Sequence, residues 1–163
     1  MRIRQFQTGD EEALFDVFFS SIHQIASKDY TAEQVNAWAP VGRDPESWAA
    51  RMRTLQPFVV EIGGVIVGYA DVRSDGYIDH FFVSGGYSRR GVGKMLMERI
   101  HEETVRLSIH ELTADVSKTA EPFFVRYGFQ VVERRFPVRK GVTLQNALMR
   151  KVLDTAGGIG LAS

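Results

Sequence analysis

The 163-residue chain contains no cysteine. It therefore cannot form disulfides, cysteine-ligated zinc sites or a thiol nucleophile. It also has no excess of either charge, because 20 Lys and Arg residues balance 20 Asp and Glu residues. A nucleic-acid-binding domain is usually clearly basic, so we expect no nucleic-acid partner.

Long apolar runs are missing as well. Residues 1–6 (MRIRQF) alternate between polar and apolar side chains, a pattern typical neither of a signal peptide nor of a membrane anchor. We therefore expect a cytoplasmic protein without a membrane partner. Four histidines are present, and His101 and His110 do not have the spacing of metal ligands, so no metal site is expected.

What is present is typical of one mixed α/β domain. Hydrophobic residues make up 44% of the chain and charged residues 25%, an ordinary globular balance in a chain long enough to bury a core. Periodicity predicts strands over residues 2–7, 58–62, 65–72, 77–83 and 112–116, and a closing antiparallel pair over 130–138 and 142–149. It predicts helices over residues 11–27, 31–38 and from 44 onward, a long helix over 92–107 and a short one over 119–127. We assign residues 1–153 to a single domain and predict that the glycine-rich tail 154–163 is disordered.

Local signals mark several element ends. Asp10 is placed to cap the first helix. Thr31 and Gln34 have the spacing of a capping box at the start of the second. Gly63-Gly64 predicts a hairpin turn between two strands, and Lys140-Gly141 separates the closing pair.

The segment from Tyr77 to Lys94 (YIDHFFVSGGYSRRGVGK) carries the clearest chemical signal. A strand runs into a loop rich in glycine and arginine, and the loop opens a helix. The first turn of a helix has unpaired N–H groups and partial positive charge, and glycines let a phosphate approach that backbone closely. The loop is therefore a candidate cradle for a pyrophosphate, with Arg89 and Arg90 adding charge.

Two common phosphate motifs do not fit this loop. A P-loop needs glycine where Ser88 stands and Ser or Thr where Met95 stands. A Rossmann fingerprint needs glycine at Leu96 and a parallel βαβ pattern around it. A glycine-rich turn that simply caps a basic helix stays open as the plain alternative.

The loop, with Gly91 and Gly93, resembles the pyrophosphate motif of the GNAT superfamily of acyltransferases. Residues 112–129 (LTADVSKTAEPFFVRYGF) resemble its second signature, a strand and a short helix that ends in an aromatic Gly-Phe turn. The resemblance covers nearly the whole chain. It extends to the YafP-like bacterial branch, whose Tyr-Thr/Ser-x-x-Gln-x-x-Ala-Trp-Ala pattern is matched by Tyr30, Thr31, Gln34, Ala37, Trp38 and Ala39.

This resemblance implies an α/β fold of the GNAT type, with a mixed, largely antiparallel sheet, a central splayed parallel strand pair and flanking helices. It implies acetyl-CoA as the co-substrate that donates the acetyl group, in a reaction that uses no metal. The backbone of the strand Phe81, Phe82 and Val83 would bond the pantetheine arm, and Ser117 stands where many members have an arm-binding Asn. The pyrophosphate would lie on the backbone of Ser88, Arg89, Arg90, Gly91, Val92, Gly93 and Lys94.

Two aromatic residues, Phe123 and Phe124, would lie along the arm and the thioester. For the side chains of Phe81, Val83 and Phe123, the simpler interpretation is hydrophobic core. The chain also departs from the superfamily's pattern at two positions. Ser88 replaces a common Gln or Arg, and Phe124 replaces the tyrosine that many members use as general acid.

No proton can come from Phe124, and the nearest hydroxyl in sequence belongs to Tyr127. Tyr127 is our candidate acid, although it lies three helical positions from Phe124. A thiolate with an ordinary pKa near ~8.5 is a tolerable leaving group without an acid.

The expected chemistry is attack by a neutral amine on the acetyl carbonyl, which requires loss of a proton from the amine. Asp79, on the strand before the loop, is our first candidate, either as base or as anchor for a cationic substrate. Alternation places it on the same face as Phe81 and Val83, and places His80 on the other face. A strand-end charge that faces solvent is the plain alternative for both residues.

A small-molecule primary amine is the expected acceptor. Candidate pocket residues are His23, Tyr30, Trp38, His80 and Asn146. Ordinary packing is an equal interpretation for Tyr30 and the preferred one for Trp38, and His23 is equally consistent with a solvated side chain. A peptide or protein acceptor stays open. So does a non-catalytic acetyl-CoA-binding module, which Phe124 alone supports. Dimers are common in the superfamily, so a homodimer stays open too, although nothing in this sequence indicates one.

Overall fold

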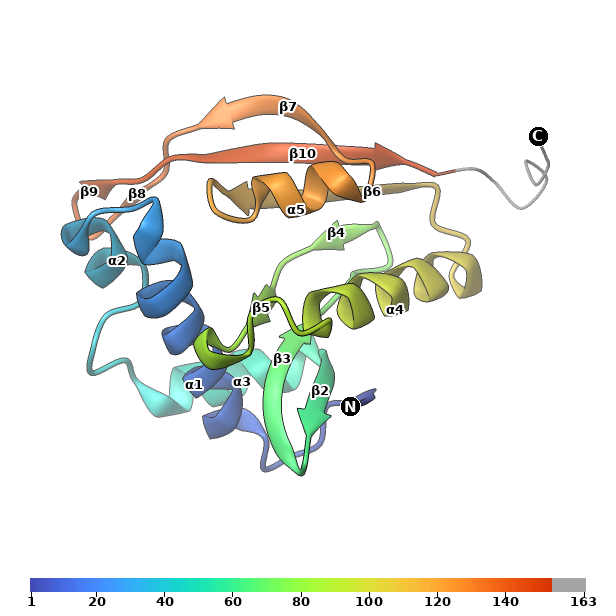
Figure 1. Cartoon of the computed structure of the whole chain (residues 1–163), viewed down its shortest axis with the longest axis horizontal. Helices are drawn as coiled ribbons and strands as arrows, with labels where there is room; N and C mark the ends of the chain where they lie inside the picture. Colours follow the sequence, from blue (N-terminus) through green and yellow to red (C-terminus); the bar gives the residue numbers. More distant parts are fainter. Residues whose placement is uncertain (154–163) are drawn as a thin grey trace.

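The computed structural model of this protein describes residues 1–153, and the disorder predicted for residues 154–163 lies outside the described residues. The chain forms two four-stranded sheets, ordered β1-β2-β3-β5 and β4-β6-β10-β7 (Figure 1). In chain order the elements are β1 (Arg2–Gln5), α1 (Glu11–Ser20), a π-helical segment (Ser21–Ile25), a 3₁₀ turn (Ala26–Lys28), α2 (Ala32–Trp38), α3 (Pro45–Leu55), β2 (Phe58–Ile62), β3 (Val65–Ala70), β4 (Tyr77–Ile78), β5 (Phe81–Val83), a 3₁₀ turn (Gly85–Tyr87), α4 (Val92–Arg106), β6 (Glu111–Ser117), α5 (Glu121–Arg126), β7 (Gln130–Arg135), β8 (Val138–Arg139), β9 (Val142–Thr143) and β10 (Asn146–Val152).

The first sheet is antiparallel throughout and is covered on both faces. Strand β2 pairs with β1 and β3, and β3 pairs with β5. The predicted hairpin turn is confirmed, since Gly63 and Gly64 both have positive φ. Helix α4 packs on β2 and β3, and α1 packs on β3 and on α3. Two separate hydrophobic clusters form in consequence, one around α4 and one around α1.

The predicted helix over residues 11–27 is one helical run with three hydrogen-bonding patterns. After α1 the chain widens into the π-helical segment and then tightens into a 3₁₀ turn. Asp10 occupies the N-cap position of α1 as predicted, but its side chain makes no capping bond. Its carboxylate instead accepts two hydrogen bonds from the Arg4 guanidinium, at 2.8 and 3.0 Å. An ion pair with the first strand has replaced the local cap.

The next two helix starts follow their sequence signals. Thr31 and Gln34 form both bonds of the capping box that begins α2. Asp44 accepts a hydrogen bond from the Glu46 N–H at the start of α3, where Pro45 is the first helical residue. These caps fix the direction of the two helices that flank the site described below.

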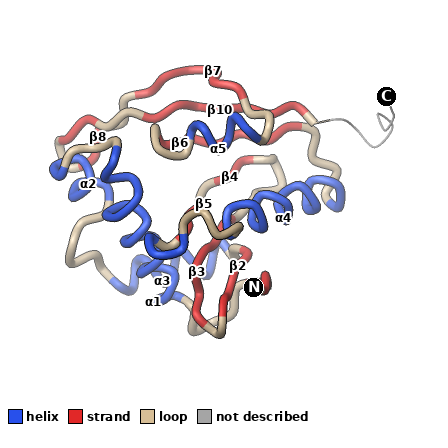
Figure 2. The backbone as a smooth tube through the Cα atoms, in the orientation of Figure 1, coloured by secondary structure: helices blue, strands red, loops and turns tan. Residues whose placement is uncertain are grey.

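The second sheet closes the chain. Strand β10 lies between β6 and β7 and is antiparallel to both. The predicted turn at Lys140-Gly141 is confirmed, with positive φ at both residues, and it joins the small hairpin β8–β9. The tube view shows this sheet above the first one, with α5 packed on its inner side (Figure 2).

The predicted strand over residues 77–83 is interrupted. Its first part, β4, pairs in parallel with β6 through Tyr77 and Ile78. Its second part, β5, pairs with β3 alone. The parallel pair predicted at the centre of the sheet therefore exists for two residues and then splays apart.

Candidate functional site

A buried carboxylate explains where the strand breaks. Asp71, 4% exposed, accepts hydrogen bonds on one oxygen from the backbone N–H groups of Asp79 and His80, at 2.9 and 2.7 Å. Its own N–H donates to the His80 carbonyl at 3.1 Å. Burial raises the pKa of Asp71 to about 6 against the effect of these hydrogen bonds. Asp71 thus holds the bend between β4 and β5.

The splay leaves backbone groups of β5 without a partner strand. The backbone groups of His80 and Ser84 bond to β3, through Asp71 and Val67. Because antiparallel neighbours alternate in their direction of bonding, Phe81 and Val83 present their N–H and C=O groups to the opposite edge. At that edge β6 has already diverged. The free edge of β5 can therefore bond an extended ligand.

The loop before α4 supplies a second set of free donors. Among residues 1–153, no acceptor is found for the backbone N–H groups of residues 89–94. Gly91 has φ 85°, a left-handed conformation that favours glycine. A Cβ at Gly93 would lie 3.2 Å from the Phe123 ring. The backbone N–H groups at the α4 N-terminus are thus unpaired and electropositive, and the Phe123 ring packs closely against Gly93.

Helix α4 sits close to the sheet because of another glycine. A Cβ at Gly68 in β3 would lie 2.5 Å from the Val92 side chain. The missing side chain lets the first turn of α4 rest directly on β3. That contact fixes the loop relative to the free edge of β5.

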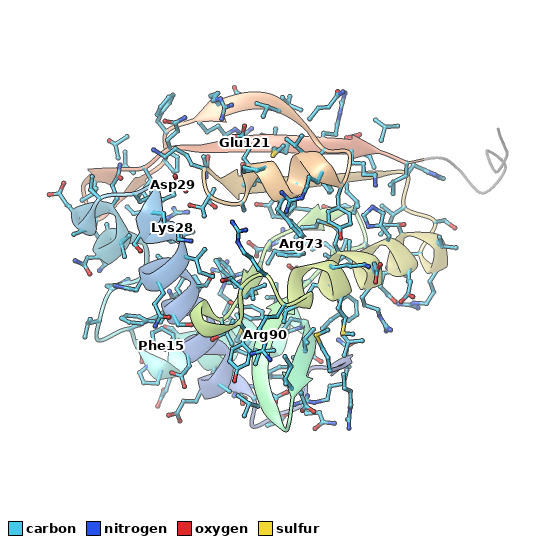
Figure 3. All side chains as sticks on the ribbon, in the orientation of Figure 1. Phe15, Lys28, Asp29, Arg73, Arg90 and Glu121 are labelled. Carbon is cyan, nitrogen blue, oxygen red and sulfur yellow. The ribbon has the colours of Figure 1, made fainter. Side chains whose placement is uncertain are left out.

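A cleft of about 820 Å³ joins these parts. Its walls are the splayed strands, the loop and α5, and they include Phe81, Phe82, Val83, Ser88, Arg89, Gly91, Gly93, Lys94, Ser117, Phe123 and Phe124. Figure 3 labels Lys28, which lines the cleft from the first helical run, and Arg90, on the loop before α4. The Arg90 guanidinium lies over the Tyr87 ring, 5.1 Å from its centre.

Some of the predicted cleft residues also have structural tasks. The Ser117 hydroxyl accepts a hydrogen bond from the Ala120 N–H at 3.1 Å. Phe124 is buried and packs edge-on against Phe81 and Phe129. Phe124 is therefore a core residue that also reaches the cleft wall.

A second cavity, of about 610 Å³, lies against the first. Trp38, Asp79 and Phe82 line both cavities. The second cavity is bounded by α2, α3, the loop between them and the β8–β9 hairpin, with lining residues that include Phe18, Arg43, Arg51, His80, Arg139 and Lys140. The two cavities thus meet at the bend that Asp71 holds.

Asp79 and His80 lie together at this junction. Asp79 Oδ2 accepts hydrogen bonds from Arg51 at 3.3 Å and from Arg73 at 2.9 Å. The Nε of Arg51 donates to His80 Nε2 at 3.2 Å. One guanidinium therefore reaches both side chains, although His80 packs with Phe18 and Phe82 in the cluster around α1, as alternation predicts, while Phe81 and Val83 pack in the cluster around α4.

His80 is held as a neutral imidazole. It is 6% exposed, and burial lowers its pKa to about 4. Because Nε2 accepts from Arg51, the proton is on Nδ1, which donates to the Tyr69 hydroxyl at 2.9 Å. His80 therefore has no free lone pair with which to serve as base, and its role is to hold Arg51 in place.

Three predicted pocket residues lie outside both cavities. The buried Tyr30 hydroxyl donates to the Gln145 carbonyl and accepts from the Lys118 N–H at 2.9 Å. His23 stacks on Phe19 at 3.9 Å between ring centres, and its Nε2 lies 2.7 Å from the Ala39 carbonyl. Asn146 begins β10, opposite Ser117, and its Oδ1 is buried without a hydrogen-bond partner among residues 1–153.

Tyr127 lies on the wall of the larger cleft. Its ring packs on Phe123 with 4.9 Å between centres. It does not line the second cavity, whereas Asp79 lines both. The structure thus brings Asp79 and Trp38 together at the junction and leaves Tyr127 along the cleft.

Reasoning from the sequence missed the arginines and the buried carboxylate. Arg43, Arg51 and Arg73 converge on this region from separate segments, and no sequence spacing links them. Asp71 did leave a signal, because it is a charged residue at the end of the apolar run 65–72. A charge in such a place needs buried partners.

Comparisons with known proteins identify the architecture. Residues 26–153 match the family model described as an acetyltransferase (GNAT) domain. This chain belongs to the GNAT acetyltransferase family. It is 36% identical over 150 residues to YafP, described as an uncharacterized N-acetyltransferase of Escherichia coli (strain K12), a match that covers 92% of this chain and 95% of YafP.

Solved structures of GNAT enzymes superpose over nearly the whole chain. A GCN5-related N-acetyltransferase from Rhodopseudomonas palustris has a TM-score of 0.88 at 30% identity, covering 93% of this chain and 95% of that one. YncA from Salmonella typhimurium, solved with acetyl-CoA, has a TM-score of 0.68 at 20% identity, covering 94% of each chain. The predicted family, branch and fold class are confirmed, and the chain is an N-acetyltransferase.

Two searches of the described residues add structural detail. Within residues 1–153 no three His, Asp or Glu side chains are grouped so that they could hold a metal ion. No helix in the same range is long and apolar enough to span a membrane.

Proposed function

We propose that this GNAT enzyme transfers the acetyl group of acetyl-CoA to the primary amine of a small molecule. The observation that carries the proposal is the meeting of two cavities at Asp79, Trp38 and Phe82. One cavity is lined by the loop at the N-terminus of α4, and the other by the α2–α3 loop and the β8–β9 hairpin. Such an arrangement suits two reactants that must meet at one point.

The larger cleft has the features that acetyl-CoA, as the acetyl donor, requires. Its unpaired N–H groups at residues 89–94 suit a pyrophosphate, and the free edge of β5 suits the amides of a pantetheine arm. Two GNAT structures that share this fold are solved with coenzyme A, in PaiA from Thermoplasma acidophilum, and with acetyl-CoA, in YncA. These features support acetyl-CoA as the donor.

The reaction is direct transfer. The amine nitrogen attacks the acetyl carbonyl carbon, the carbon–sulfur bond breaks, CoA leaves as the thiolate and the amine loses one proton. The N–H groups of Phe81 and Val83 are the candidates to stabilise the carbonyl oxygen as negative charge develops on it. Asp79 is the candidate to orient the amine, because its Oδ1 accepts no hydrogen bond from residues 1–153 while Oδ2 is held by two arginines.

The size of the second cavity suits a small acceptor. The tip of the β8–β9 hairpin, residues Arg139 and Lys140, lines it. The hairpin is tied to α2 by a hydrogen bond of 3.1 Å from Gln34 Nε2 to the Thr143 carbonyl. A cavity of about 610 Å³ can hold a metabolite-sized ligand.

A thiol-release assay with acetyl-CoA tests the proposal. Small amines and short peptides with free N-termini are compared at equal concentrations. We expect CoA release with at least one small amine, at a rate well above hydrolysis. Release with peptides alone would overturn the small-molecule acceptor.

A further inference from the structure

The second cavity, like the larger cleft, has more cations than carboxylates on its walls. Arg43, Arg51, Arg139 and Lys140 line it, against the two carboxylates Asp44 and Asp79. The chain as a whole has zero net charge, so the excess is local. The larger cleft shares only Asp79 of these six residues.

Both carboxylates are already engaged. Asp44 accepts hydrogen bonds from the Glu46 N–H and the Ser47 hydroxyl, at 3.2 and 3.0 Å. Asp79 is paired with Arg51 and with Arg73, which approaches from outside the cavity. With four cations and two carboxylates on its walls, the cavity keeps an excess of positive charge.

Arg43 is the one cation of the four that is partly buried. Its guanidinium lies over the rings of Phe18 and Trp48, at 5.3 and 4.9 Å from their centres. Among residues 1–153 it has no hydrogen-bond acceptor and no carboxylate within salt-bridge distance. Burial, followed by the charge of Arg51, lowers the pKa of Arg43. An arginine that is half-buried and oriented by two aromatic rings is prepared for a planar anion.

We propose that the acceptor carries an anionic group, a carboxylate or a phosphate, near its amine. Arg43 binds that anion through its fork of N–H donors, while Asp79 orients the amine at the junction. Arg139 and Lys140 add attraction from the hairpin. The inference rests on the proposed function and narrows its acceptor to amines that bear an acid.

The phosphates of the donor do not account for these arginines. The loop before α4 has its own cations, and Arg89 and Lys94 line the larger cleft. Arg43 and Arg51 line the second cavity and not the larger cleft. Their charge therefore faces the acceptor's side of the junction.

Matched acceptors test this in the thiol-release assay. The pairs are L-methionine with L-methioninamide, L-phenylalanine with L-phenylalaninamide, and O-phosphoethanolamine with ethanolamine. Each amide keeps the amine and lacks the carboxylate. In the third pair, ethanolamine keeps the amine and lacks the phosphate. The α-amine of an amide is the weaker base, so chemistry alone would favour the amide. We expect kcat/KM to favour the acid by at least ~10-fold in one pair, as hydrogen bonds to charged groups would produce.

Arg43→Gln should remove that preference. It should lower kcat/KM for the acid ~10- to 100-fold and lower it less for the neutral partner, so that the ratio between the two falls. Arg43→Lys keeps the charge without the planar guanidinium. Its kcat/KM for the acid should lie between the values for wild type and Arg43→Gln. Arg53→Gln, on the same helix as Arg51 but outside both cavities, controls for loss of charge. Thermal unfolding of each variant shows whether it is folded.

The outcomes separate this inference from the proposed function. Turnover of neutral amines as fast as their acidic partners overturns the anionic acceptor and leaves amine acetylation standing. A preference for the acid that is unchanged in folded Arg43→Gln overturns Arg43 as the residue that binds the anion. No CoA release above hydrolysis with any small amine, in wild-type enzyme, overturns both.

Discussion

At the scale of single residues, the site depends on three polar side chains next to one another in space. Asp71 holds the bend, His80 is kept neutral and fixes Arg51, and Asp79 faces both cavities. Each is stabilised by neighbours distant in sequence, so their chemistry is set by tertiary contacts. Two of them lead to predictions about pH.

Asp79→Asn should lower kcat/KM more at neutral pH than at alkaline pH. At pH 7 the amine arrives protonated, and loss of a positioned proton acceptor costs ~10²-fold. At pH 9 more of the amine is already neutral, so the loss should shrink. Steady-state rates from pH 6.5 to 9.5 measure this. Arg73→Gln is the control, since it removes one partner of Asp79 and keeps the carboxylate, and an equal loss in Asp79→Asn at every pH would exclude the base role.

Asp71→Asn should stabilise the protein increasingly as pH rises from about 4 to about 6. An acid whose pKa is raised on folding, here to about 6, weakens the fold over the interval between its unfolded value near ~3.9 and its folded value. Asn keeps an oxygen acceptor for the N–H groups of Asp79 and His80 and cannot ionise. The gain should level off above pH 7 at no more than ~3 kcal/mol, as urea unfolding at several pH values would show.

Asp71→Ala is the matched comparison. It leaves two buried N–H groups without their acceptor, which should destabilise the fold by ~1–3 kcal/mol for each group left unsatisfied, at every pH. Acetyl-CoA affinity should fall as well, because the splay is no longer held. If Asp71→Asn instead loses stability relative to wild type as the pH rises from 4 to 6, then ionisation of the Asp71 carboxylate does not destabilise the fold.

At the scale of elements, the loop and first turn of α4 form the unit that can hold the donor's phosphates. Its backbone conformation needs Gly91 at positive φ, and its position needs Gly68 beneath Val92. These are requirements of shape, and few side chains contribute. We therefore expect the unit to function with Ser88 at the position where the superfamily's motif has Gln or Arg.

Gly91→Glu should reduce acetyl-CoA affinity by at least ~10²-fold while the fold survives. The substitution strains a left-handed backbone by ~1–2 kcal/mol and places a carboxylate where a pyrophosphate would lie. Gly86→Glu is the control, because a Cβ at Gly86 meets nothing within 4 Å and the residue does not line the cleft. Calorimetric titration measures both, and equal affinities in wild type and Gly91→Glu would remove this loop from the donor site.

The same scale shows where sequence patterns suffice. The capping box at Thr31 and the turns at Gly63-Gly64 and Lys140-Gly141 depend on neighbouring residues, so their patterns predicted them. The interruption at Asp79 depends on Asp71, whose carboxylate replaces a strand partner. The alternation of side chains along residues 77–83 does not predict that the Asp71 carboxylate binds the backbone N–H groups of Asp79 and His80.

At the scale of the whole molecule, two sheets that part at one strand create both cavities. The N-terminal helices and the β8–β9 hairpin close the second cavity from opposite ends of the chain, and Tyr30 links them through Gln145 and Lys118. The sequence motif made Tyr30 a candidate for the acceptor pocket, but its hydroxyl bonds the backbone of these segments and its side chain lines neither cavity. The convergence of Arg43, Arg51 and Arg73 on the junction follows from this closure and has no signature in sequence.

The most direct test of acetyl transfer follows the acetyl group itself. Enzyme, acetyl-CoA carrying ¹³C in both acetyl carbons, and the amine panel are incubated together, and small-molecule products are analysed by mass spectrometry. We predict an amine product that is heavier by one labelled acetyl group and forms in step with CoA release. Label recovered only as acetate, at the rate of hydrolysis without acceptor, would contradict amine acetylation by this protein.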